Sequence, residues 1–416
     1  MDFIEDLKWR DLFKDCTDEE GLREQLKQQV TCYCGFDPTA DSLHIGHLQQ
    51  IMLLKRYQEA GYRPIALCGG ATGMIGDPRP TTERKLLTAK DVEHNVACIK
   101  QQLSKFLDFE SGRALLLNNY DWLGKIDLLT FLREYGKYFN VAYMLNKDTI
   151  ASRLQTGISY TEFTYTILQA MDWLHLYQNY DCSLQIGGSD QWGNLTSGTD
   201  LIRKVEGDKA HVFGITSPLI TKSDGSKFGK SEGKNIWLDK EKTSPYTFYQ
   251  FWLNVSDADV IPFLKRLTLL SKEKIEELAL SLQTEPHLRK AQKALAEYLT
   301  VLVHGEAEFA NALKITNTFF NGDIRELNGK QIKQGLESAP TTTIANNTLL
   351  IDALIQIKAA KSKREARELI NNNSVAVNGE KRKDLDFVLS KKDAFDQELT
   401  VIKKGKKNWF VVLFED

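Results

Sequence analysis

Residues 30–73 read VTCYCGFDPTADSLHIGHLQQIMLLKRYQEAGYRPIALCGGATG. The apolar run 30–36 predicts a short buried strand, and residues 64–68 predict a second strand that leads into a glycine-rich turn. Between the two lies an amphipathic stretch, which predicts a helix ending at Gly61. Strand, helix and strand at these spacings indicate a right-handed crossover and therefore a parallel sheet.

The rest of the chain extends this pattern. Residues 184–190 predict a further strand with a glycine turn, and helical patterns dominate from about 125 to 180 and from about 245 to 315. The expected fold class is α/β: a Rossmann-like parallel-sheet domain, followed by a helical domain and a small α+β module. Ligands of such sheets bind at the carboxyl ends of the strands, where the glycine-rich turns lie.

The composition is that of an ordinary globular protein. Hydrophobic residues make up 42% of the 416 residues, charged residues make up 26%, and the formal net charge is −2. No apolar run approaches the roughly 20 residues of a membrane-spanning helix, and the N-terminus lacks the pattern of a signal peptide. The six cysteines are dispersed, which predicts reduced thiols. We expect a cytoplasmic protein with no metal site and no membrane association.

The predicted helix opens with His44-Ile45-Gly46-His47, and Asp41 or Ser42 is its candidate cap. Two histidines three residues apart project from one face of the first turn. The unpaired backbone N–H groups of such a turn attract phosphate, and the glycine lets a flat ligand approach the backbone. Alone, this pattern favours two structural histidines over a binding site.

A second feature, residues 222–231, reads KSDGSKFGKS. Its glycines and serines predict a mobile loop, in which Lys227 and Lys230 bring two ammonium groups to a polyphosphate. Positive charge held in this way stabilises the charge that develops on a transferring nucleotidyl group. Alone, the segment favours the interpretation as an exposed basic loop.

Together and in this order, the two features resemble the H-I-G-H and K-M-S-K-S signatures of class I aminoacyl-tRNA synthetases. Phe228 and Gly229 stand where Met and Ser are usual, a variant similar to the tyrosine-specific branch. The runs YCGFDPTADSLH (33–44) and QIGGSDQWGN (185–194) resemble further blocks of the bacterial-type tyrosyl-tRNA synthetases. The resemblance covers nearly the whole chain.

The resemblance implies a tyrosine–tRNA ligase. Such an enzyme activates tyrosine with ATP to tyrosyl-adenylate, releases pyrophosphate, and transfers the tyrosine to the 3′ end of tRNA(Tyr). The implied domains are a catalytic domain at 1–225 with a dimer-forming helical insertion around 120–180, a mobile lysine loop and helical domain at 226–320, a linker at 321–346, and an RNA-binding module of ribosomal-protein type at 347–416.

Three polar residues, Tyr165, Gln169 and Asp172, share one face of a helix whose neighbours are apolar. A polar stripe inside a buried helix needs partners. The resemblance implies that Tyr165 and Gln169 hold the ammonium group of tyrosine together with Asp77, and that Asp172 and Tyr33 bind the phenolic OH. Phenylalanine there would leave buried polar groups unpaired, which rejects it by about 10⁴–10⁵-fold, a magnitude measured on this same enzyme family.

ATP with Mg²⁺ is the implied substrate complex, and no tightly bound cofactor is expected. The tyrosine carboxylate attacks the α-phosphate, so catalysis needs positioning and charge stabilisation but no side-chain nucleophile. The implied catalytic residues are His44, His47, Lys227, Lys230 and Ser231. Gln191 completes the tyrosine set, and the implied ATP and adenylate set is Cys34, Gly35, Asp37, Thr39, Gly46, Gly188, Asp190 and Lys230.

One loop departs from the family. After the turn at Asp77, residues 79–84 read RPTTER, which is one residue shorter than the family pattern and lacks its lysine. Arg79, Arg84 and Lys85 are the candidate substitutes as phosphate contacts. A guanidinium group is not a simple replacement for an ammonium group.

The last module carries 14 Lys or Arg against 11 Asp or Glu. It contains a predicted basic helix at 361–370, followed by a strand and an Asn-Gly turn. This arrangement resembles a small RNA-binding module shared with a ribosomal small-subunit protein. The residues implied to contact the long variable arm of tRNA(Tyr) are Lys361, Lys363, Arg364 and Arg367. The resemblance also implies a homodimer, with helical residues from about 130 to 170 as its interface.

Two alternatives stay open. The first is a tryptophanyl-tRNA synthetase, the nearest class I relative, although Asp172 and Tyr33 suit a phenol better than an indole. The second is a non-catalytic RNA-binding protein that retains a synthetase fold, against which the intact histidine and lysine signatures argue.

Overall fold

The computed structural model describes residues 2–78, 86–154, 157–207, 209–223, 228, 230–231, 234–405 and 408–415. The chain forms two compact units. The first unit comprises Met1–Thr243 and Trp252–Val303, and the second unit comprises Ser244–Phe251 and His304–Asp416.

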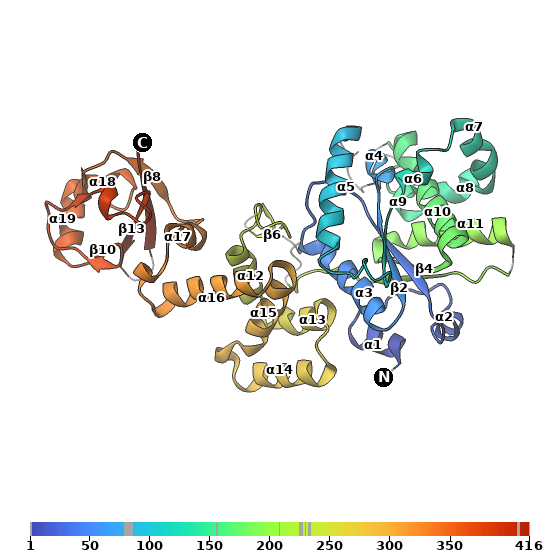
Figure 1. Ribbon diagram of the computed structural model, residues 1–416, viewed down its shortest axis with the longest axis horizontal. Helices are drawn as coiled ribbons and strands as arrows, with labels where there is room; N and C mark the ends of the chain where they lie inside the picture. The colour runs from blue at the N-terminus through green and yellow to red at the C-terminus, as the bar shows by residue number, and fades with distance from the viewer. Residues whose placement is uncertain are drawn as a thin grey trace. The chain divides into compact units, whose positions relative to one another are not determined.

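A parallel sheet organises the first unit (Figure 1). Within the described residues it has the order β3-β2-β1-β4-β5 and consists of β1 (Thr31–Phe36), β2 (Arg63–Cys68), β3 (Leu115–Asn118), β4 (Cys182–Gly188) and β5 (Phe213–Ser217). Each neighbouring pair is parallel, which confirms the expected Rossmann-like sheet. The strand order reverses between β1 and β4, and sheets of this kind bind ligands at such a switch point.

Helices cover both faces of this sheet. α3 (Leu48–Glu59) and α5 (Ala89–Leu103) pack on β2, whereas α10 (Tyr160–Tyr180) and α11 (Trp192–Glu206) pack on β4 and against each other. In Figure 1 the first pair lies on one side of the sheet and the second pair on the other. The close approach of α11 to α10 depends on Gly198, where a Cβ atom would lie 2.4 Å from Cε3 of Trp173.

Further helices belong to the two units, and those from Leu128 to Ala151 and from Pro245 to Asn321 confirm the helical patterns expected at about 125–180 and 245–315. They are α1 (Phe3–Trp9), α2 (Glu19–Gln25), α4 (Thr72–Ile75), α6 (Tyr120–Leu123), α7 (Leu128–Thr130), α8 (Val141–Leu145), α9 (Asp148–Ala151), α12 (Pro245–Leu253), α13 (Asp257–Leu267), α14 (Lys272–Thr284), α15 (Lys290–His304) and α16 (Glu306–Asn321). Among the described residues, none of the helices has both the length and the apolar character needed to cross a bilayer.

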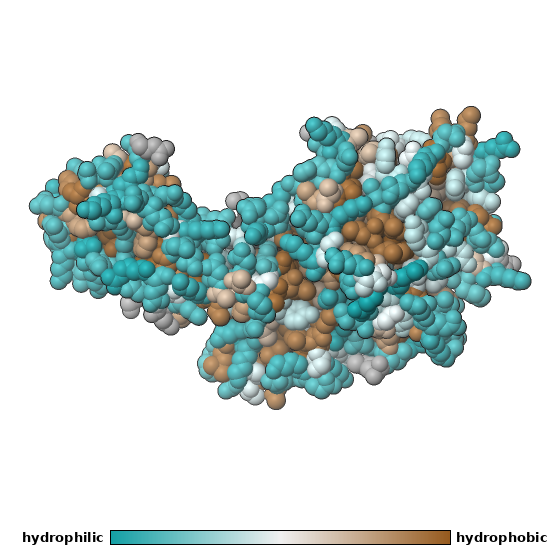
Figure 2. Space-filling model, in the orientation of Figure 1, coloured by the Kyte–Doolittle hydropathy of each residue, from teal (hydrophilic) through white to brown (hydrophobic). Residues whose placement is uncertain are grey.

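Large apolar side chains gather at the surface of the segment between β3 and α10. Figure 2 shows hydrophobic residues exposed in the region of α7. The residues of this apolar surface are between 48% and 75% exposed. They are Tyr120, Leu128, Leu129, Leu132, Val141, Tyr143, Leu154 and Tyr160. An exposed apolar surface of this kind on a folded protein typically marks an interaction site.

The second unit contains a mixed sheet of the order β11-β10-β13-β14-β8 in its described part. The strands are β8 (Thr341–Ile344), β10 (Val375–Val377), β11 (Glu380–Lys381), β13 (Leu399–Lys404) and β14 (Asn408–Phe414). The apolar sides of α18 (Leu350–Gln356) and α19 (Lys363–Asn371) share one core with the sheet. Asn378 and Gly379 both have positive φ angles, as a tight hairpin turn requires.

The linker expected at 321–346 is wrong. This stretch contains α17 (Gly329–Gly335) as well as β8, and β8 pairs in parallel with β14. The sheet of the last module therefore begins before residue 347. Prolines and small polar residues made the stretch resemble a linker, but its threonines are β-branched and suit a strand once a partner strand is present.

Candidate active site

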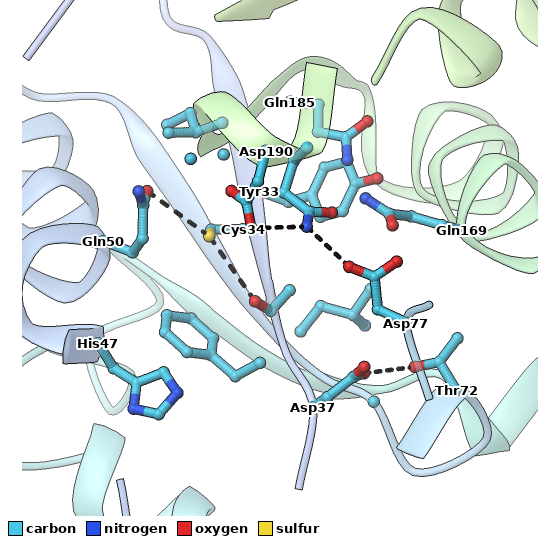
Figure 3. A pocket seen from close by; sticks show the side chains of 18 of the residues that line it. Tyr33, Cys34, Asp37, His47, Gln50, Thr72, Asp77, Gln169, Gln185 and Asp190 are labelled. Atoms are coloured by element: carbon cyan, nitrogen blue, oxygen red, sulfur yellow. Dashed lines mark hydrogen bonds between the residues drawn. The ribbon is translucent and has the colours of Figure 1, made fainter. Parts of the chain in front are cut away.

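A cavity of about 420 Å³ opens at the carboxyl ends of β1 and β4, at the switch point of the sheet (Figure 3). Most of the side chains that the sequence assigns to tyrosine, ATP or adenylate line it. These lining residues are Tyr33, Cys34, Gly35, Asp37, Thr39, His44, Gly46, His47, Asp77, Tyr165, Gln169, Asp172, Gly188, Asp190 and Gln191. The fold therefore gathers into one pocket residues that are spread over more than 150 positions of the sequence.

The carboxylate of Asp172 lies buried in this pocket with two donors. Asn119 Nδ2 donates to Oδ2 of Asp172 at 2.9 Å, and Trp122 Nε1 donates to Oδ1 at 2.8 Å. Burial raises the pKa of Asp172 to about 7, although the two hydrogen bonds oppose this shift. Near neutral pH the carboxyl group of Asp172 therefore exists partly as an ionised acceptor and partly as a protonated acid.

Three buried polar groups beside Asp172 have no hydrogen-bond partner among the described residues. They are the hydroxyl of Tyr33, Oε1 of Gln169 and Oε1 of Gln185. Burial, and then the charge of Asp172, raises the pKa of Tyr33, so its hydroxyl keeps its proton and is able to donate it in a hydrogen bond. Unpaired buried polar groups are costly, and a polar ligand is one way to satisfy them.

Two further carboxylates, Asp37 and Asp77, line the same pocket. Asp37 accepts from the hydroxyl of Tyr165 at 2.9 Å and from Thr72 Oγ1 at 2.8 Å. Asp77 accepts from Gln191 Nε2 at 2.9 Å. The structure therefore links Tyr165 directly to Asp37. Two carboxylates in one pocket attract a cation.

The histidine signature forms its own cap. His44, and not Asp41 or Ser42, is the N-cap of a 3-10 turn at Ile45–His47 that leads into α3, so the expected caps are wrong. Nδ1 of His44 accepts from the backbone N–H of Gly46 at 3.0 Å, and Nδ1 of His47 accepts from the N–H of His44 at 3.1 Å. The imidazole ring itself supplies the acceptor that an aspartate or serine supplies in other helices.

Burial determines the protonation of both histidines, and the cap determines which ring nitrogen keeps the proton. Burial lowers the pKa of His44, and burial together with the charge of His44 lowers the pKa of His47 to about 3. Both rings are therefore neutral at pH 7. Because each Nδ1 accepts a hydrogen bond, the proton lies on Nε2, which becomes the donor toward a ligand.

The lysine signature is described only in part. Lys227 lies outside the described residues, and so do the loop residues 79–85. Lys230 and Ser231 form the backbone of β6 (Lys230–Ser231), which pairs with β7 (Lys234–Asn235); their side chains lie outside the described part. The neighbouring Ser223 N–H donates to Asp259 Oδ1 at 2.8 Å.

The basic residues that the resemblance implies for RNA binding lie in the second unit, on α19 and in the segment just before it. Lys363, Arg364 and Arg367 are on α19 and Lys361 precedes it, and all four are exposed. Lys363 pairs with Asp352 at 2.8 Å, and Arg364 pairs with Glu368 at 3.1 Å.

Sequence reasoning missed four residues of the pocket region: Thr72, Asn119, Trp122 and Gln185. A signal was present for Asn119, because it directly follows the apolar run that forms β3, and strand ends of this sheet line the pocket. Trp122 left no comparable signal, since its indole contacts Asp172 across 50 residues of sequence. Among the described residues, no group of three or more His, Cys, Asp or Glu has a geometry able to hold a metal ion.

Family models match nearly the whole chain. A model described as "tRNA synthetases class I (W and Y)" matches residues 25–321, and one described as "Tyrosine--tRNA ligase SYY-like C-terminal domain" matches residues 331–412. A tyrosine–tRNA ligase from Staphylococcus epidermidis is 53% identical over 416 residues, which cover 99% of each chain.

Solved structures agree with these matches. A C-terminally truncated mitochondrial tyrosyl-tRNA synthetase from Coccidioides posadasii is 32% identical, with a TM-score of 0.67 over 76% of this chain and 91% of that one. A tryptophanyl-tRNA synthetase from Plasmodium falciparum has a TM-score of 0.54 at 15% identity, over 79% of this chain and 87% of that one. The second likeness extends only to the fold.

Proposed function

This chain belongs to the class I tyrosine–tRNA ligases, and from this membership we propose how its pocket recognises tyrosine and forms tyrosyl-adenylate. The enzyme joins tyrosine to tRNA(Tyr) in two steps, activation by ATP and transfer to the RNA. Neither the tryptophanyl enzyme nor a non-catalytic relic is favoured, because relatives at about 53% identity over the full chain are tyrosine–tRNA ligases.

The observation that carries the proposal is the buried carboxylate of Asp172 beside the unpaired hydroxyl of Tyr33. A phenolic OH between them donates to Asp172 and accepts from Tyr33. Phenylalanine would leave the Tyr33 hydroxyl unpaired and would offer Asp172 no further donor, whereas tyrosine satisfies both groups. Asn119 and Trp122 keep the carboxylate in place for this contact.

The ammonium group of tyrosine binds on the side of the pocket that carries the carboxylates of Asp37 and Asp77. Asp77 and Tyr165 remain the proposed contacts, and the unpaired Oε1 of Gln169 supplies a third acceptor. Asp37, which accepts from Tyr165, adds negative charge to this side of the pocket. With both ends of tyrosine held, its carboxylate faces the remaining volume, which receives ATP.

ATP enters with Mg²⁺ as the substrate complex. The Nε2–H groups of His44 and His47 donate to phosphate oxygens, and the ammonium groups of Lys227 and Lys230 with the hydroxyl of Ser231 neutralise the leaving pyrophosphate. Gly46 keeps the backbone accessible, and the adenylate lies along the remaining ATP set: Cys34, Gly35, Asp37, Thr39, Gly188 and Asp190. Because the cap hydrogen bonds hold the two histidine rings before the reaction, these donors stabilise charge without reorganisation.

The second unit is the proposed RNA-binding part. Exposed Lys361, Lys363, Arg364 and Arg367 present positive charge that suits a phosphate backbone. Because β8 belongs to this sheet, the module includes residues before 347. Removal of residues 323–416 is expected to spare adenylate formation and abolish transfer to tRNA(Tyr).

The apolar surface that includes Leu128, Leu129 and Tyr160 supports a homodimer interface around residues 120–160. Leu129 is 75% exposed in the single chain, and burial of such side chains favours association. Replacement of Leu129 by Asp is expected to convert a dimer to a monomer in sedimentation experiments.

The deciding experiment is amino-acid-dependent ATP–pyrophosphate exchange with tyrosine, phenylalanine and tryptophan. The intact enzyme should exchange with tyrosine, and Asp172→Asn should lose most of that activity or its preference over phenylalanine. Asp121→Asn, an exposed aspartate next to Trp122, serves as the control. Unchanged rate and selectivity in Asp172→Asn would remove the proposed phenol site.

A further inference from the structure

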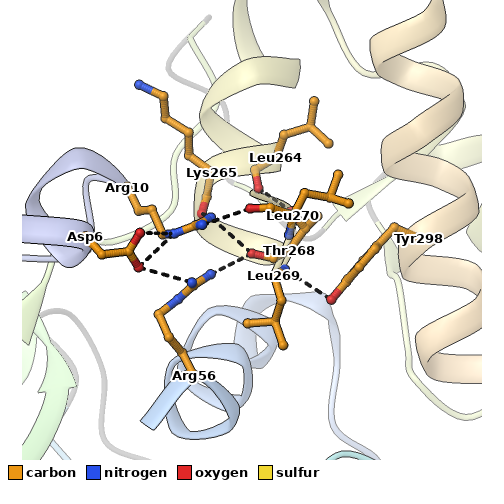
Figure 4. Close-up of polar contacts among 9 residues, drawn as sticks. All are labelled: Asp6, Arg10, Arg56, Leu264, Lys265, Thr268, Leu269, Leu270 and Tyr298. Carbon is orange, nitrogen blue, oxygen red and sulfur yellow. Dashed lines mark hydrogen bonds and ion pairs between the residues drawn. The ribbon is translucent and has the colours of Figure 1, made fainter. Parts of the chain in front are cut away.

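Two arginine side chains from other helices cap the C-terminal end of α13 (Figure 4). Arg10, which follows α1, donates to the carbonyl oxygens of Lys265 at 3.2 Å and of Leu270 at 2.8 Å. Arg56, in the last turn of α3, donates to the carbonyl oxygen of Thr268 at 2.6 Å. The last carbonyl groups of a helix lack intrahelical partners and carry partial negative charge, so guanidinium groups stabilise them.

One carboxylate joins the two arginines. Asp6 accepts from Arg10 Nε at 2.9 Å and from Arg56 Nη1 at 3.2 Å. The side chains of Arg10 and Arg56 are only 5% and 9% exposed. Burial lowers the pKa of Arg56 to about 10, so its guanidinium group still carries a charge at neutral pH. Desolvation makes such a buried cluster a poor source of stability, which favours a positional role for it.

The other end of α13 contacts the lysine signature. Asp259, in the first turn of α13, accepts from the backbone N–H of Ser223 at 2.8 Å. Further along the helix, the ring of Phe263 lies 5.1 Å from the ring of Phe228, centroid to centroid. Ser223 and Phe228 both belong to the lysine signature at residues 222–231, so the position of α13 determines where this segment is anchored.

α3 carries the histidine signature at its start and Arg56 near its end. The three residues Asp6, Arg10 and Arg56, which we call the arginine clamp, therefore join α3, which follows the histidine signature, to α13, which contacts the lysine signature. An α-helix transmits the position of one end to the other through its backbone hydrogen bonds; in α13 only the N–H of Pro262 is missing from this ladder. The clamp fixes the distance between the two helices at one point.

We propose that the arginine clamp positions α13 against α3 so that the lysine signature reaches the phosphates bound at the histidine signature. This inference rests on the proposed role of Lys227 and Lys230 in adenylate formation. Asp6, Arg10 and Arg56 are positioning residues: they act through α13 and touch no substrate. The clamp affects the rate of nucleotidyl transfer and leaves the tyrosine pocket unchanged.

The test measures ATP–pyrophosphate exchange in Arg56→Met and Arg56→Lys. Arg56→Met is expected to lower kcat about 10- to 100-fold, the range in which small misplacements of reacting groups operate, with the KM for tyrosine unchanged. Arg56→Lys keeps the charge but loses the planar fork that reaches Asp6 and Thr268 together, so an intermediate loss is expected. A rise in the KM for tyrosine with an unchanged kcat would overturn the proposal.

A matched control exists in the same region. Arg23 also bridges helices through ion pairs, joining Glu19 of α2 to Glu5 of α1, without belonging to the clamp. Arg23→Met should leave kcat unchanged. Thermal unfolding followed by circular dichroism shows whether each variant is folded at the assay temperature. If Arg56→Met is unfolded there, kcat and the KM for tyrosine are compared in Arg56→Lys.

A double-mutant cycle with Lys230→Ala separates the clamp from the proposed lysine chemistry. If the clamp acts through the lysine signature, Arg56→Met causes little further loss in the Lys230→Ala background. If the two losses multiply, the clamp proposal fails and the lysine role stands. If Lys230→Ala alone leaves kcat unchanged, the lysine role fails, and the clamp proposal falls with it.

Discussion

The indole Nε1 of Trp122 donates to Asp172 Oδ1 at 2.8 Å, and these residues lie 50 positions apart in the sequence. The indole ring also stacks on His175, with ring centroids 4.2 Å apart. Trp122 thus has two functions: its ring packs against α10, and its N–H orients the carboxylate proposed to recognise the phenol. The two functions can be separated because phenylalanine keeps the ring contact and lacks the donor.

Trp122→Phe is therefore expected to raise the KM for tyrosine by about tenfold or more, since a hydrogen bond to a charged group contributes about 1.5–3 kcal/mol. The KM for ATP should stay close to that of the parent enzyme. Steady-state pyrophosphate exchange measures both constants. An unchanged KM for tyrosine would mean that Asn119 alone orients Asp172.

Tyrosine binding should depend on pH through Asp172. Its pKa is raised to about 7 by burial, so the ionised acceptor predominates above this pH and the protonated acid below it. If the ionised form binds the phenol, the dissociation constant of tyrosine rises as the pH falls from 8 to 6, approaching about tenfold per unit below the pKa. His47, with a pKa of about 3, does not titrate in this window.

Equilibrium binding of tyrosine to the parent enzyme and to Asp172→Asn, measured from pH 6 to pH 8, checks this expectation. The variant should give a flat profile, because the group that titrates is gone. A parallel dependence in both proteins would assign the titration to another group.

Gly46→Ala should disturb the histidine signature. A Cβ atom at this position would lie 2.7 Å from Cε1 and 2.8 Å from Nδ1 of His44. The His44 ring must then move and lose its hydrogen bond from the Gly46 N–H. We expect adenylate formation to slow by about 10- to 100-fold with tyrosine affinity preserved, as measured by single-turnover kinetics and equilibrium binding. A parent-like rate would show that the position of this ring is not critical.

Gly198→Ala should destabilise the first unit. The added Cβ atom would lie 2.4 Å from the ring of Trp173, which is fully buried between α10 and α11. Overpacking of this kind costs about 1–3 kcal/mol. Gly193→Ala on the same helix is the control, because its Cβ atom would meet nothing closer than 3.9 Å. Urea unfolding should separate the two variants, and equal midpoints would contradict the packing argument.

The sequence by itself determined the parallel sheet and the glycine-rich strand ends, whereas the pocket residues were implied by the family resemblance. These features are local: a buried strand, an amphipathic helix and a glycine turn each follow from the spacing of apolar residues over a few positions. The histidine and lysine signatures are also short runs of sequence, and the resemblance carried by them implied the family to which the chain belongs.

The tertiary structure decided which polar groups pair. Tyr165 donates to Asp37 across 128 residues, a pairing that no short run of sequence indicates. The donors to Asp172, the caps on α13 and the pairing of β8 with β14 likewise join segments far apart in the chain. A hydrogen bond depends on distances of about 3 Å and on direction, and only the packing of whole helices and strands brings such distant groups to that range.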